Sequence, residues 1–188
     1  MSDATEMAML EAEEKMAKAL EVAREDMSAI RTGRAHPGMF SKVTVDYYGS
    51  PTPMQQLASF QVPDARTILI QPYDKSSLQA VEKALRDSDN SVNPSNDGNQ
   101  IRIIMPQLTE ERRRDYIKVA RTKGEDAKIS VRNIRRQAKD TIEGAVKDGD
   151  IGEDEGSRTE KELEALTKKF VDSIDEVLKH KEAELLEV

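Results

Sequence analysis

The stretch RTGRAHPGMF, residues 31–40, ends a helical pattern that has run almost from the start of the chain. Between residues 4 and 30, apolar side chains recur at intervals of three and four, while Glu and Lys occupy most other positions. Gly33, Pro37 and Gly38 then predict that this helix stops near residues 30–32. Helical spacing returns only after Pro106, so this stretch decides how the chain is divided.

The segment between the two helical patterns predicts a small strand-rich α/β module. Alternation over residues 43–47 and the β-branched run at 68–70 indicate strands, and the turn sequence NDG leads into a strand over 101–105. We interpret SPTP, residues 50–53, as a turn. We also expect Ser76 or Ser77 to cap a short amphipathic helix.

Two further helices are predicted after Pro106. Thr109 is placed to cap the first of them, which extends to about Lys147. The sequence KDGDIGEDEG, residues 147–156, separates it from the second. Gly152 and Gly156 bracket the start of that last helix, where we expect stronger helix formers or a cap.

The first helix has no neighbour of its own to pack against, and two helices alone bury little surface. We therefore predict an α+β fold: an antiparallel three-helix bundle formed by residues 1–30 and 106–188, with residues 31–105 inserted as an α/β domain. The alternative is one continuous elongated helical array. Insertion requires two linkers that run side by side and act as a hinge with Gly33 as the pivot. The predicted hinge residues are Arg31, Thr32, Gly33, Arg34, Met105, Pro106 and Gln107.

Composition narrows the class of protein. The 188 residues include no cysteine, which excludes disulfides, thiolate chemistry and cysteine-based zinc sites. Charged residues make up 35% and aromatic residues 4%, which suits long exposed helices. We find no signal-peptide, transit-peptide or membrane-spanning pattern, and we expect a cytoplasmic monomer that binds neither membranes nor DNA.

Positive charge is concentrated in one segment of an acidic chain of net charge −7. Residues 110–139 hold 11 basic and 5 acidic residues, whereas residues 140–188 hold 7 basic and 16 acidic ones. Placed at 100° per residue, the basic residues form one longitudinal stripe beside the apolar seam, over about 38 Å. We call this the basic stripe; its residues are Arg114, Lys118, Arg121, Lys128, Arg132, Arg135, Arg136 and Lys139.

The basic stripe has two interpretations. Same-sign neighbours such as Arg132 and Arg136 repel each other, which favours an anionic partner, and the planar fork of arginine suits phosphate. With almost no aromatic residues, a rigid arginine-bearing helix fits folded RNA better than single strands. The alternative is a solvated face whose charges are neutralised by acids of the last helix.

No catalytic or cofactor-binding pattern is found. His36 and His180 are far apart and lack the spacing of a metal pair. The glycine-rich sequences that cradle nucleotide phosphates are missing as well. We therefore predict that the protein is not an enzyme and needs neither metal nor cofactor.

Five segments in order resemble the ribosome recycling factor family. They are IRTGRAHP (30–37), VDYYGSPTPMQQLA (45–58), AVEKAL (80–85), LTEERRRD (108–115) and VRNIRR (131–136). The resemblance implies a long three-helix bundle with an inserted β/α/β domain and an L shape of tRNA-like dimensions. It also implies that the matching arginines, Arg132 and Arg135 with Arg136, carry the contact with 23S-type rRNA of the large ribosomal subunit.

The resemblance further implies an activity. Members of the family act with elongation factor G and GTP on the post-termination 70S ribosome and split it into subunits, which frees mRNA and tRNA. Two other hypotheses remain beside this one: a coiled-coil adaptor whose basic stripe docks an acidic protein, and a hydrolase that turns over substrate without a partner.

Overall fold

A computed structural model describes residues 3–88 and 92–187 of the chain. These residues contain three long helices, α1 (Asp3–Ala29), α4 (Glu110–Lys147) and α5 (Glu153–Leu186), and a sheet-containing segment between α1 and α4. The chain forms two compact units. We call Met1–Arg24 with Val119–Lys181 the helical unit, and Glu25–Lys118 with Glu182–Val188 the sheet unit.

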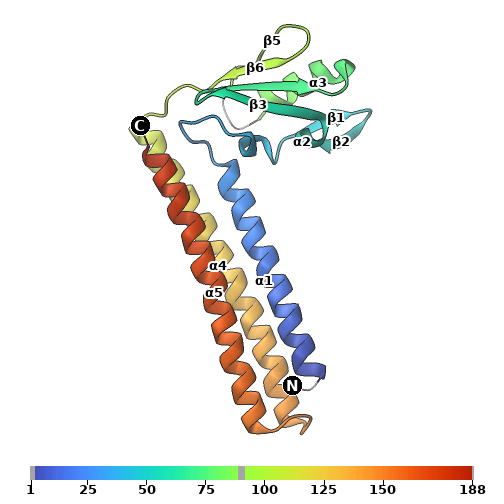
Figure 1. The fold of residues 1–188 in the computed structure, drawn as a ribbon, viewed down its shortest axis with the longest axis vertical. Coiled ribbons are helices and arrows are strands. Elements are labelled where there is room, and N and C mark those ends of the chain that lie inside the picture. Colours follow the sequence, from blue (N-terminus) through green and yellow to red (C-terminus); the bar gives the residue numbers. More distant parts are fainter. Residues whose placement is uncertain (1–2, 89–91, 188) are drawn as a thin grey trace. The chain divides into compact units, whose positions relative to one another are not determined.

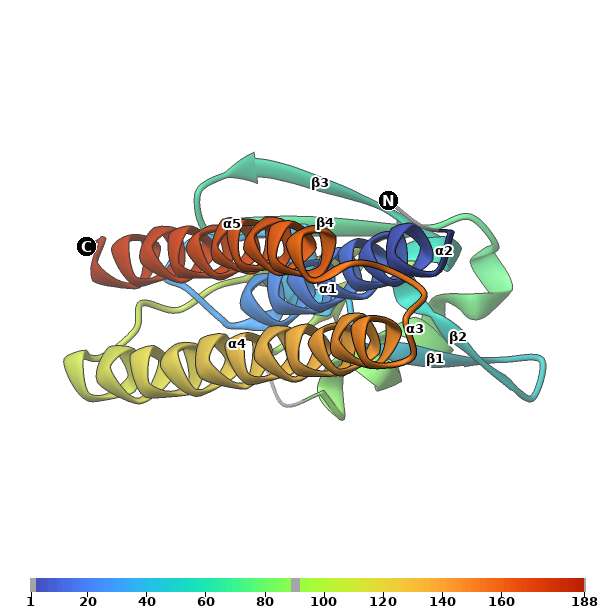
Figure 2. The same ribbon diagram turned by 90° about the horizontal axis from the view of Figure 1, so that it is seen from below.

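The helical unit is a bundle whose first helix is distant in sequence from the other two. α1, α4 and α5 lie side by side in both ribbon views (Figures 1 and 2). Met16 from α1, Val131 from α4 and Ile174 from α5 belong to one buried cluster, and all three are fully excluded from solvent. The predicted α+β class is confirmed, and the alternative of a continuous helical array is wrong. The exact domain boundaries after residues 30 and 105 stay a prediction.

The sheet unit contains two antiparallel sheets. The smaller pairs β1 (Thr44–Tyr47) with β2 (Ser50–Pro53), and the larger has the order β3-β4-β6-β5. The larger sheet comprises β3 (Ala58–Asp64), β4 (Thr67–Pro72), β6 (Ile101–Ile104) and β5 (Ser95–Asn96). The remaining elements are the short helices η1 (Pro37–Phe40), α2 (Met54–Leu57), η2 (Lys75–Ser77) and α3 (Leu78–Arg86).

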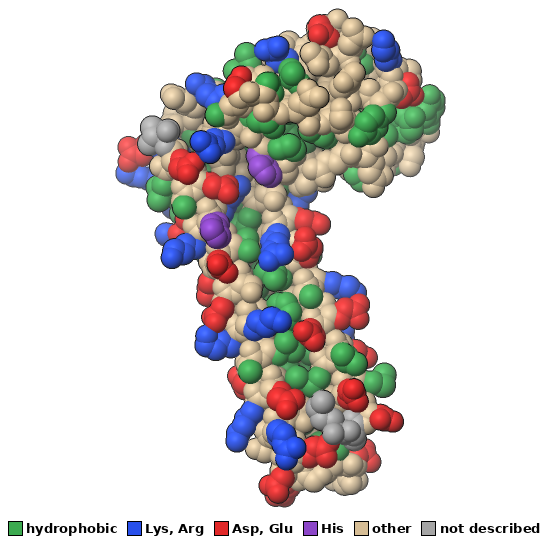
Figure 3. Space-filling view, in the orientation of Figure 1, with side chains coloured by type: hydrophobic (Ala, Val, Ile, Leu, Met, Phe, Trp, Pro, Cys, Tyr) green, Lys and Arg blue, Asp and Glu red, His purple; other side chains and the backbone are tan. Residues whose placement is uncertain are grey.

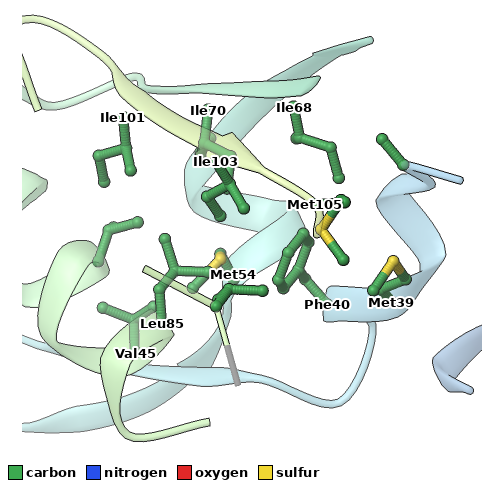
Figure 4. Close-up of a cluster of buried hydrophobic side chains, with 14 of the residues drawn as sticks. Met39, Phe40, Val45, Met54, Ile68, Ile70, Leu85, Ile101, Ile103 and Met105 are labelled. Carbon is green, nitrogen blue, oxygen red and sulfur yellow. The ribbon is translucent and has the colours of Figure 1, made fainter. Parts of the chain in front are cut away.

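One face of the larger sheet builds the core of this unit. Ile70 pairs with Ile101, and Ile68 pairs with Ile103. Their side chains point to the same side of the sheet, toward residues of α2, α3 and η1 (Figure 4). These β-branched residues are fully buried, as expected for central strands covered by helices on one face.

Our interpretation of SPTP as a turn is wrong, because these residues form β2. The turn lies two residues earlier, at Tyr48 and Gly49, whose φ angles of 49° and 78° are both positive. Tyr47 and Ser50 close this two-residue hairpin, so Pro51 and Pro53 fall at the alternate pairs, where no N–H is required. Proline is therefore compatible with the strand.

The side-chain cap expected from Ser76 or Ser77 is not formed, and the cap in this region is that of Asp74 on η2, the turn directly before α3. Asp74 Oδ1 accepts hydrogen bonds from the backbone N–H of Ser76 at 2.9 Å and from its hydroxyl at 2.7 Å. Ser77 stands at the N-cap of α3 but makes no side-chain cap bond. In α4, by contrast, Thr109 Oγ1 accepts from Arg112 N at 3.2 Å, which confirms the predicted cap.

The turn between α4 and α5 explains one of the two glycines that we did not expect. A Cβ atom on Gly156 would stand 2.5 Å from Cγ2 of Val146, a distance too short for two carbon atoms. Gly152, in contrast, has no neighbour that would meet a Cβ. The close approach of α4 and α5 at Val146 therefore favours glycine at residue 156, since any larger residue would push the Val146 side chain aside.

Candidate nucleic-acid interface

The basic stripe lies along α4. The residues of this helix divide between a face buried in the bundle and a face exposed to solvent. In the helical unit, Val131 and Ala138 are buried in the bundle core, while Arg132 and Arg136 are exposed. The helical spacing of residues 131–138 places these two sets on different faces. The predicted separation of core and charge along this helix is thus confirmed.

Three cations of the basic stripe each lie within ion-pair distance of an acid of α5. Lys128 Nζ is 2.9 Å from Asp175, and Lys139 Nζ is 3.5 Å from Glu160. Arg135 pairs with Glu164 at 2.7 Å, while its Nε is buried without a hydrogen-bond partner among the described residues. The acids of the last helix therefore neutralise part of the stripe, as the solvated-face interpretation expects.

These pairs keep the two lysines charged. A hydrogen bond to Asp175 raises the pKa of Lys128 above its ordinary value, and a hydrogen bond to Glu143 together with the charge of Glu160 does the same for Lys139. Lys128 is also the least accessible of the paired cations, with 17% of its side chain exposed. It is thus held against the bundle rather than presented to solvent.

Arg132 and Arg136 differ from those three. Arg132 reaches Glu125 of its own helix at 3.3 Å, and 47% of its side chain is exposed. Arg136 is exposed, and within residues 3–88 and 92–187 it forms no ion pair or hydrogen bond. An exposed pair such as Arg132–Glu125 contributes about 0–1 kcal/mol, so its arginine can exchange the carboxylate for another anion.

The remaining residues of the stripe are also accessible. Arg121 is exposed in the helical unit. Arg114 and Lys118 are exposed in the sheet unit, where Arg114 pairs with Glu110 one turn earlier. On the face that Figure 3 shows, basic and acidic side chains are intermixed along the helices, so the positive field has to be local.

The predicted hinge residues meet in the sheet unit. There, arginine side chains donate hydrogen bonds to the backbone of the second linker, the segment around residues 105–108. Arg31 is only 7% exposed and donates to the carbonyl of Pro106 at 2.9 Å. Arg66 Nε donates to Met105 O at 2.9 Å, and Arg113 donates to Leu108 O at 3.3 Å. Residues 105–109 have no regular secondary structure, so these side chains supply donors that a helix or sheet would otherwise provide.

Sequence reasoning missed Arg66 and Arg113 in this arrangement. The sequence indicates only that the carbonyl groups of the segment around Pro106 need hydrogen-bond donors. The spacing of the arginines along the chain does not show which of them reach these carbonyl groups. Arg31 is buried, and its hydrogen bond to Pro106 makes it a tether between the two linkers.

The other hinge residues are less constrained. Thr32 Oγ1 accepts from Arg34 N at 3.2 Å and donates to Arg34 O, which fixes the turn between them. A Cβ on Gly33 would meet no atom within 4 Å, so packing does not require glycine there. Gly33, Arg34 and Gln107 line a cavity of about 410 Å³.

The two histidines have ordinary structural surroundings. His36 Nδ1 accepts from Gly38 N at 3.0 Å and so caps η1, and His180 is exposed on α5. Within the described ranges no three His, Asp or Glu side chains are arranged to hold a metal ion. Nor does any helix there have the length and apolarity required to span a bilayer.

Comparison with known proteins identifies the family. The sequence model described as "Ribosome recycling factor" matches residues 23–186. The chain belongs to the ribosome recycling factor family. A relative from Renibacterium salmoninarum named ribosome-recycling factor is 67% identical over 183 residues, covering 97% of this chain and 99% of its own. One from Streptomyces avermitilis is 64% identical with the same coverage.

Solved structures of the ribosome recycling factor family share the fold. The solution structure of a ribosome recycling factor superimposes with a TM-score of 0.79 at 38% identity and covers both chains completely. A second structure, described as models for the T. thermophilus ribosome recycling factor and the E. coli elongation factor G bound to the E. coli post-termination complex, has a TM-score of 0.71 at 39% identity. It covers 97% of this chain and 99% of that one.

Proposed function

We propose that this protein acts with elongation factor G and GTP to split the post-termination ribosome into subunits, freeing mRNA and tRNA for another round of translation. The observation that carries this proposal is the likeness over nearly the whole chain to a ribosome recycling factor described together with elongation factor G on a post-termination complex. Family membership supports it independently. Such a factor works in the cytoplasm, where ribosomes are.

The protein itself performs no covalent chemistry in this proposal. GTP hydrolysis is assigned to elongation factor G, because the chain lacks the glycine-rich sequences that bind nucleotide phosphates. The test is a subunit-splitting assay with elongation factor G and GTP, with and without the pure protein. We expect splitting only with all three components. Splitting at the same rate without the protein, or GTP hydrolysis by the protein alone, would count against it.

We further propose that the basic stripe is the surface that binds large-subunit rRNA. Arg132 and Arg136 are its primary contacts, because one has a weak exposed partner and the other has none among the described residues. The cations paired with α5 would exchange their carboxylates for phosphate only after Arg132 and Arg136 have bound the RNA. These cations are Lys128, Arg135 and Lys139. Arg114, Lys118 and Arg121 extend the surface along α4.

Ribosome co-sedimentation at low salt tests this surface. We expect the double variant Arg132→Ala/Arg136→Ala to lose large-subunit binding, and binding of the unchanged protein to weaken steeply as salt rises. Lys168→Ala on α5 is the control, because Lys168 is also an exposed cation, with 76% of its side chain accessible, and pairs with its own acid, Asp172, one turn away. Equal loss in the control would point to net charge alone. Binding of an acidic protein but of no ribosomal particle would favour the adaptor hypothesis.

We also propose that residues 31–34 and 105–107 form a hinge between the bundle, residues 1–30 with 106–188, and the inserted domain, residues 31–105. Gly33→Pro should leave ribosome binding intact and slow splitting, because proline fixes φ at the proposed pivot. Gly33→Ala is the control, since a Cβ there meets no neighbour. Splitting by Gly33→Pro at the rate of Gly33→Ala would refute the pivot.

A further inference from the structure

Two aromatic side chains of the sheet unit lie against each other at one hairpin. The chain has four tyrosines, three phenylalanines and no tryptophan. Tyr47 and Tyr48 lie at the β1–β2 hairpin with ring centroids 4.6 Å apart, and Tyr73 directly precedes Asp74, which both of their hydroxyls approach. Tyr47, Tyr48 and Asp74 are called the aromatic corner below, and Tyr73 adjoins it in the sequence. Figure 3 shows hydrophobic side chains gathered at the end of the unit where β1 and β2 lie.

Tyr48 of the aromatic corner and the adjoining Tyr73 are unusually accessible, whereas Tyr47 is half-buried. Tyr48 is 82% exposed and Tyr73 is 72% exposed. An exposed ring contributes little to the stability of its own fold, since the apolar gain scales with the area removed from water. Tyrosine is also among the residue types enriched at the energetic centres of protein interfaces. The accessible rings therefore suggest contact with something outside this chain.

The backbone at Tyr48 supports that interpretation. Tyr48 has a φ of 49° in a hairpin turn whose first position favours Asn, Asp or Gly. A tyrosine there is conformationally unfavourable, and its ring is mostly in solvent. Asparagine at residue 48 would adopt this backbone conformation at a lower conformational cost. Residues held in such sparsely populated backbone regions cluster at functional sites.

Asp74 adds a charged acceptor beside the rings. Its Oδ1 is used by the cap on η2, with bonds of 2.7 and 2.9 Å to Ser76. Among the residues that the structure describes, its Oδ2 receives only two long contacts, 3.4 Å each, from the hydroxyls of Tyr47 and Tyr48. Oδ2 thus keeps the capacity to accept a strong hydrogen bond. The bonds from Ser76 lower the pKa of Asp74, so the carboxylate is ionised at neutral pH.

We propose that the aromatic corner is a docking site for an arginine-bearing segment of a partner protein. A guanidinium group stacks on tyrosine faces by cation–π attraction and donates to a carboxylate through the same planar fork. Asp74 Oδ2 and Tyr48, whose hydroxyl lies 3.4 Å from it, offer both parts of that recognition. A nucleic acid would gain stacking on the rings but would bring phosphates against Asp74. The site is on the sheet unit and does not rest on the ribosomal function proposed above.

The first test is a titration of the full-length protein with the blocked peptide acetyl-Gly-Arg-Gly-Arg-Gly-amide at low salt. The ring NMR signals of the tyrosines are followed, with Tyr116 as the internal reference. We expect saturable shifts at Tyr48 and Tyr73 and none at Tyr116. The glutamate version of the peptide should produce no shift, and absence of any response at Tyr48 to the arginine peptide overturns the proposal.

Two aspartates provide a matched comparison. Asp74→Asn keeps a capping oxygen for Ser76 but removes the charge, and should weaken peptide binding about three- to tenfold. Asp97→Asn removes the same charge from another turn, where Asp97 Oδ1 accepts from the N–H groups of Asn99 and Gln100. It should change binding by less than about twofold. Equal effects of the two variants would mean that only net charge matters, which refutes the site.

Tyr48→Asn separates docking from folding. We expect its melting temperature to be unchanged or raised, because asparagine suits the left-handed turn, while peptide binding weakens at least about threefold. A lowered melting temperature would assign the ring to the packing of the hairpin itself and overturn the proposal. A hexauridylate probe completes the test: stronger shifts at Tyr48 with this RNA than with the arginine peptide would make the corner a base-stacking platform instead.

Discussion

The helical unit and the sheet unit differ in the interactions that stabilise each of them internally. The core of the sheet unit is built from large side chains on strands and helices distant in sequence, among them Phe40, Ile70 and Ile103, all fully buried. The helical unit has a thinner seam that includes Ala12 and Ala138, flanked by ion pairs between α4 and α5. Both units therefore depend on non-local apolar packing, but only in the helical unit do ion pairs between long helices border the core.

The two units can be observed separately in solution. All four tyrosines, Tyr47, Tyr48, Tyr73 and Tyr116, belong to the sheet unit, and the chain has no tryptophan. Tyrosine fluorescence therefore reports on the sheet unit, while circular dichroism at the helical band reports mainly on α1, α4 and α5. Each substitution below is expected to move one signal more than the other.

Phe40→Ala should have the largest effect. Phe40 is fully buried and stacks with Phe60 at a centroid distance of 6.3 Å. Its truncation should lower the unfolding free energy of the sheet unit by about 3–5 kcal/mol, through lost transfer energy and a residual cavity. In urea denaturation we expect the fluorescence midpoint to fall well below the circular dichroism midpoint. Coincident midpoints would show that the units unfold as one.

Arg31→Leu should have the second-largest effect on the unfolding free energy of the sheet unit. The substitution removes a part-buried, charge-assisted hydrogen bond to the Pro106 carbonyl, which costs about 1.5–3 kcal/mol. Arg34→Leu is the control, because its ion pair with Glu187 is exposed and 3.7 Å long, and should change stability by about 0.5 kcal/mol or less. Similar fluorescence midpoints for the two variants would contradict the tethering role of Arg31.

Gly156→Ala tests the close approach in the helical unit. The added Cβ forces Val146 to move, which costs about 1–3 kcal/mol and is partly offset by better helix propensity. A net loss of about 1 kcal/mol is expected from the circular dichroism midpoint. Gly144→Ala, whose Cβ would meet no atom, should instead stabilise α4 by about 0.5–1 kcal/mol. If both variants were stabilising, the contact with Val146 would not be tight.

Lowering the pH should reduce the stability of the sheet unit through the aspartates in its turns. This is the smallest of the expected effects. Hydrogen bonds from turn groups lower the pKa of Asp64, Asp74 and Asp97 below the ordinary value of 3.8. A lowered folded pKa stabilises the protein above 3.8, and this contribution is lost as the pH falls through the folded values. The fluorescence midpoint should therefore drop below about pH 4, and less steeply in Asp97→Asn. An unchanged slope in that variant would exclude its contribution.

Long periodic segments made most of the fold predictable. The apolar spacing in residues 4–30 and after Thr109 predicts α1 and α4 to within one or two residues. The hairpin at Tyr48–Gly49 was missed because prolines in SPTP suggest a turn, whereas strand pairing decides which N–H groups are needed. Gly156 could not be understood from sequence either, because its reason is a contact with another helix.

The candidate site was predictable only in part. Helical spacing places the eight cations of the basic stripe on α4 beside the core, since period and burial are local properties. Which acids of α5 face them depends on the axial register of two helices, and no local pattern encodes that register. The pairs of Arg135 with Glu164 and Lys128 with Asp175 emerged only in three dimensions. The same holds for Arg66 and Arg113 at the second linker.

The carboxylates of α5 that face the basic stripe have a further consequence. Each is an anion tethered beside its cation at a high effective concentration, so an isolated phosphate in solution competes poorly for the same site. A surface that presents many phosphates at matching spacing gains that advantage for itself, because binding at one position brings the next into reach. If the basic stripe is the rRNA-binding surface proposed above, its paired cations would discriminate against scattered anions and favour an ordered array of them.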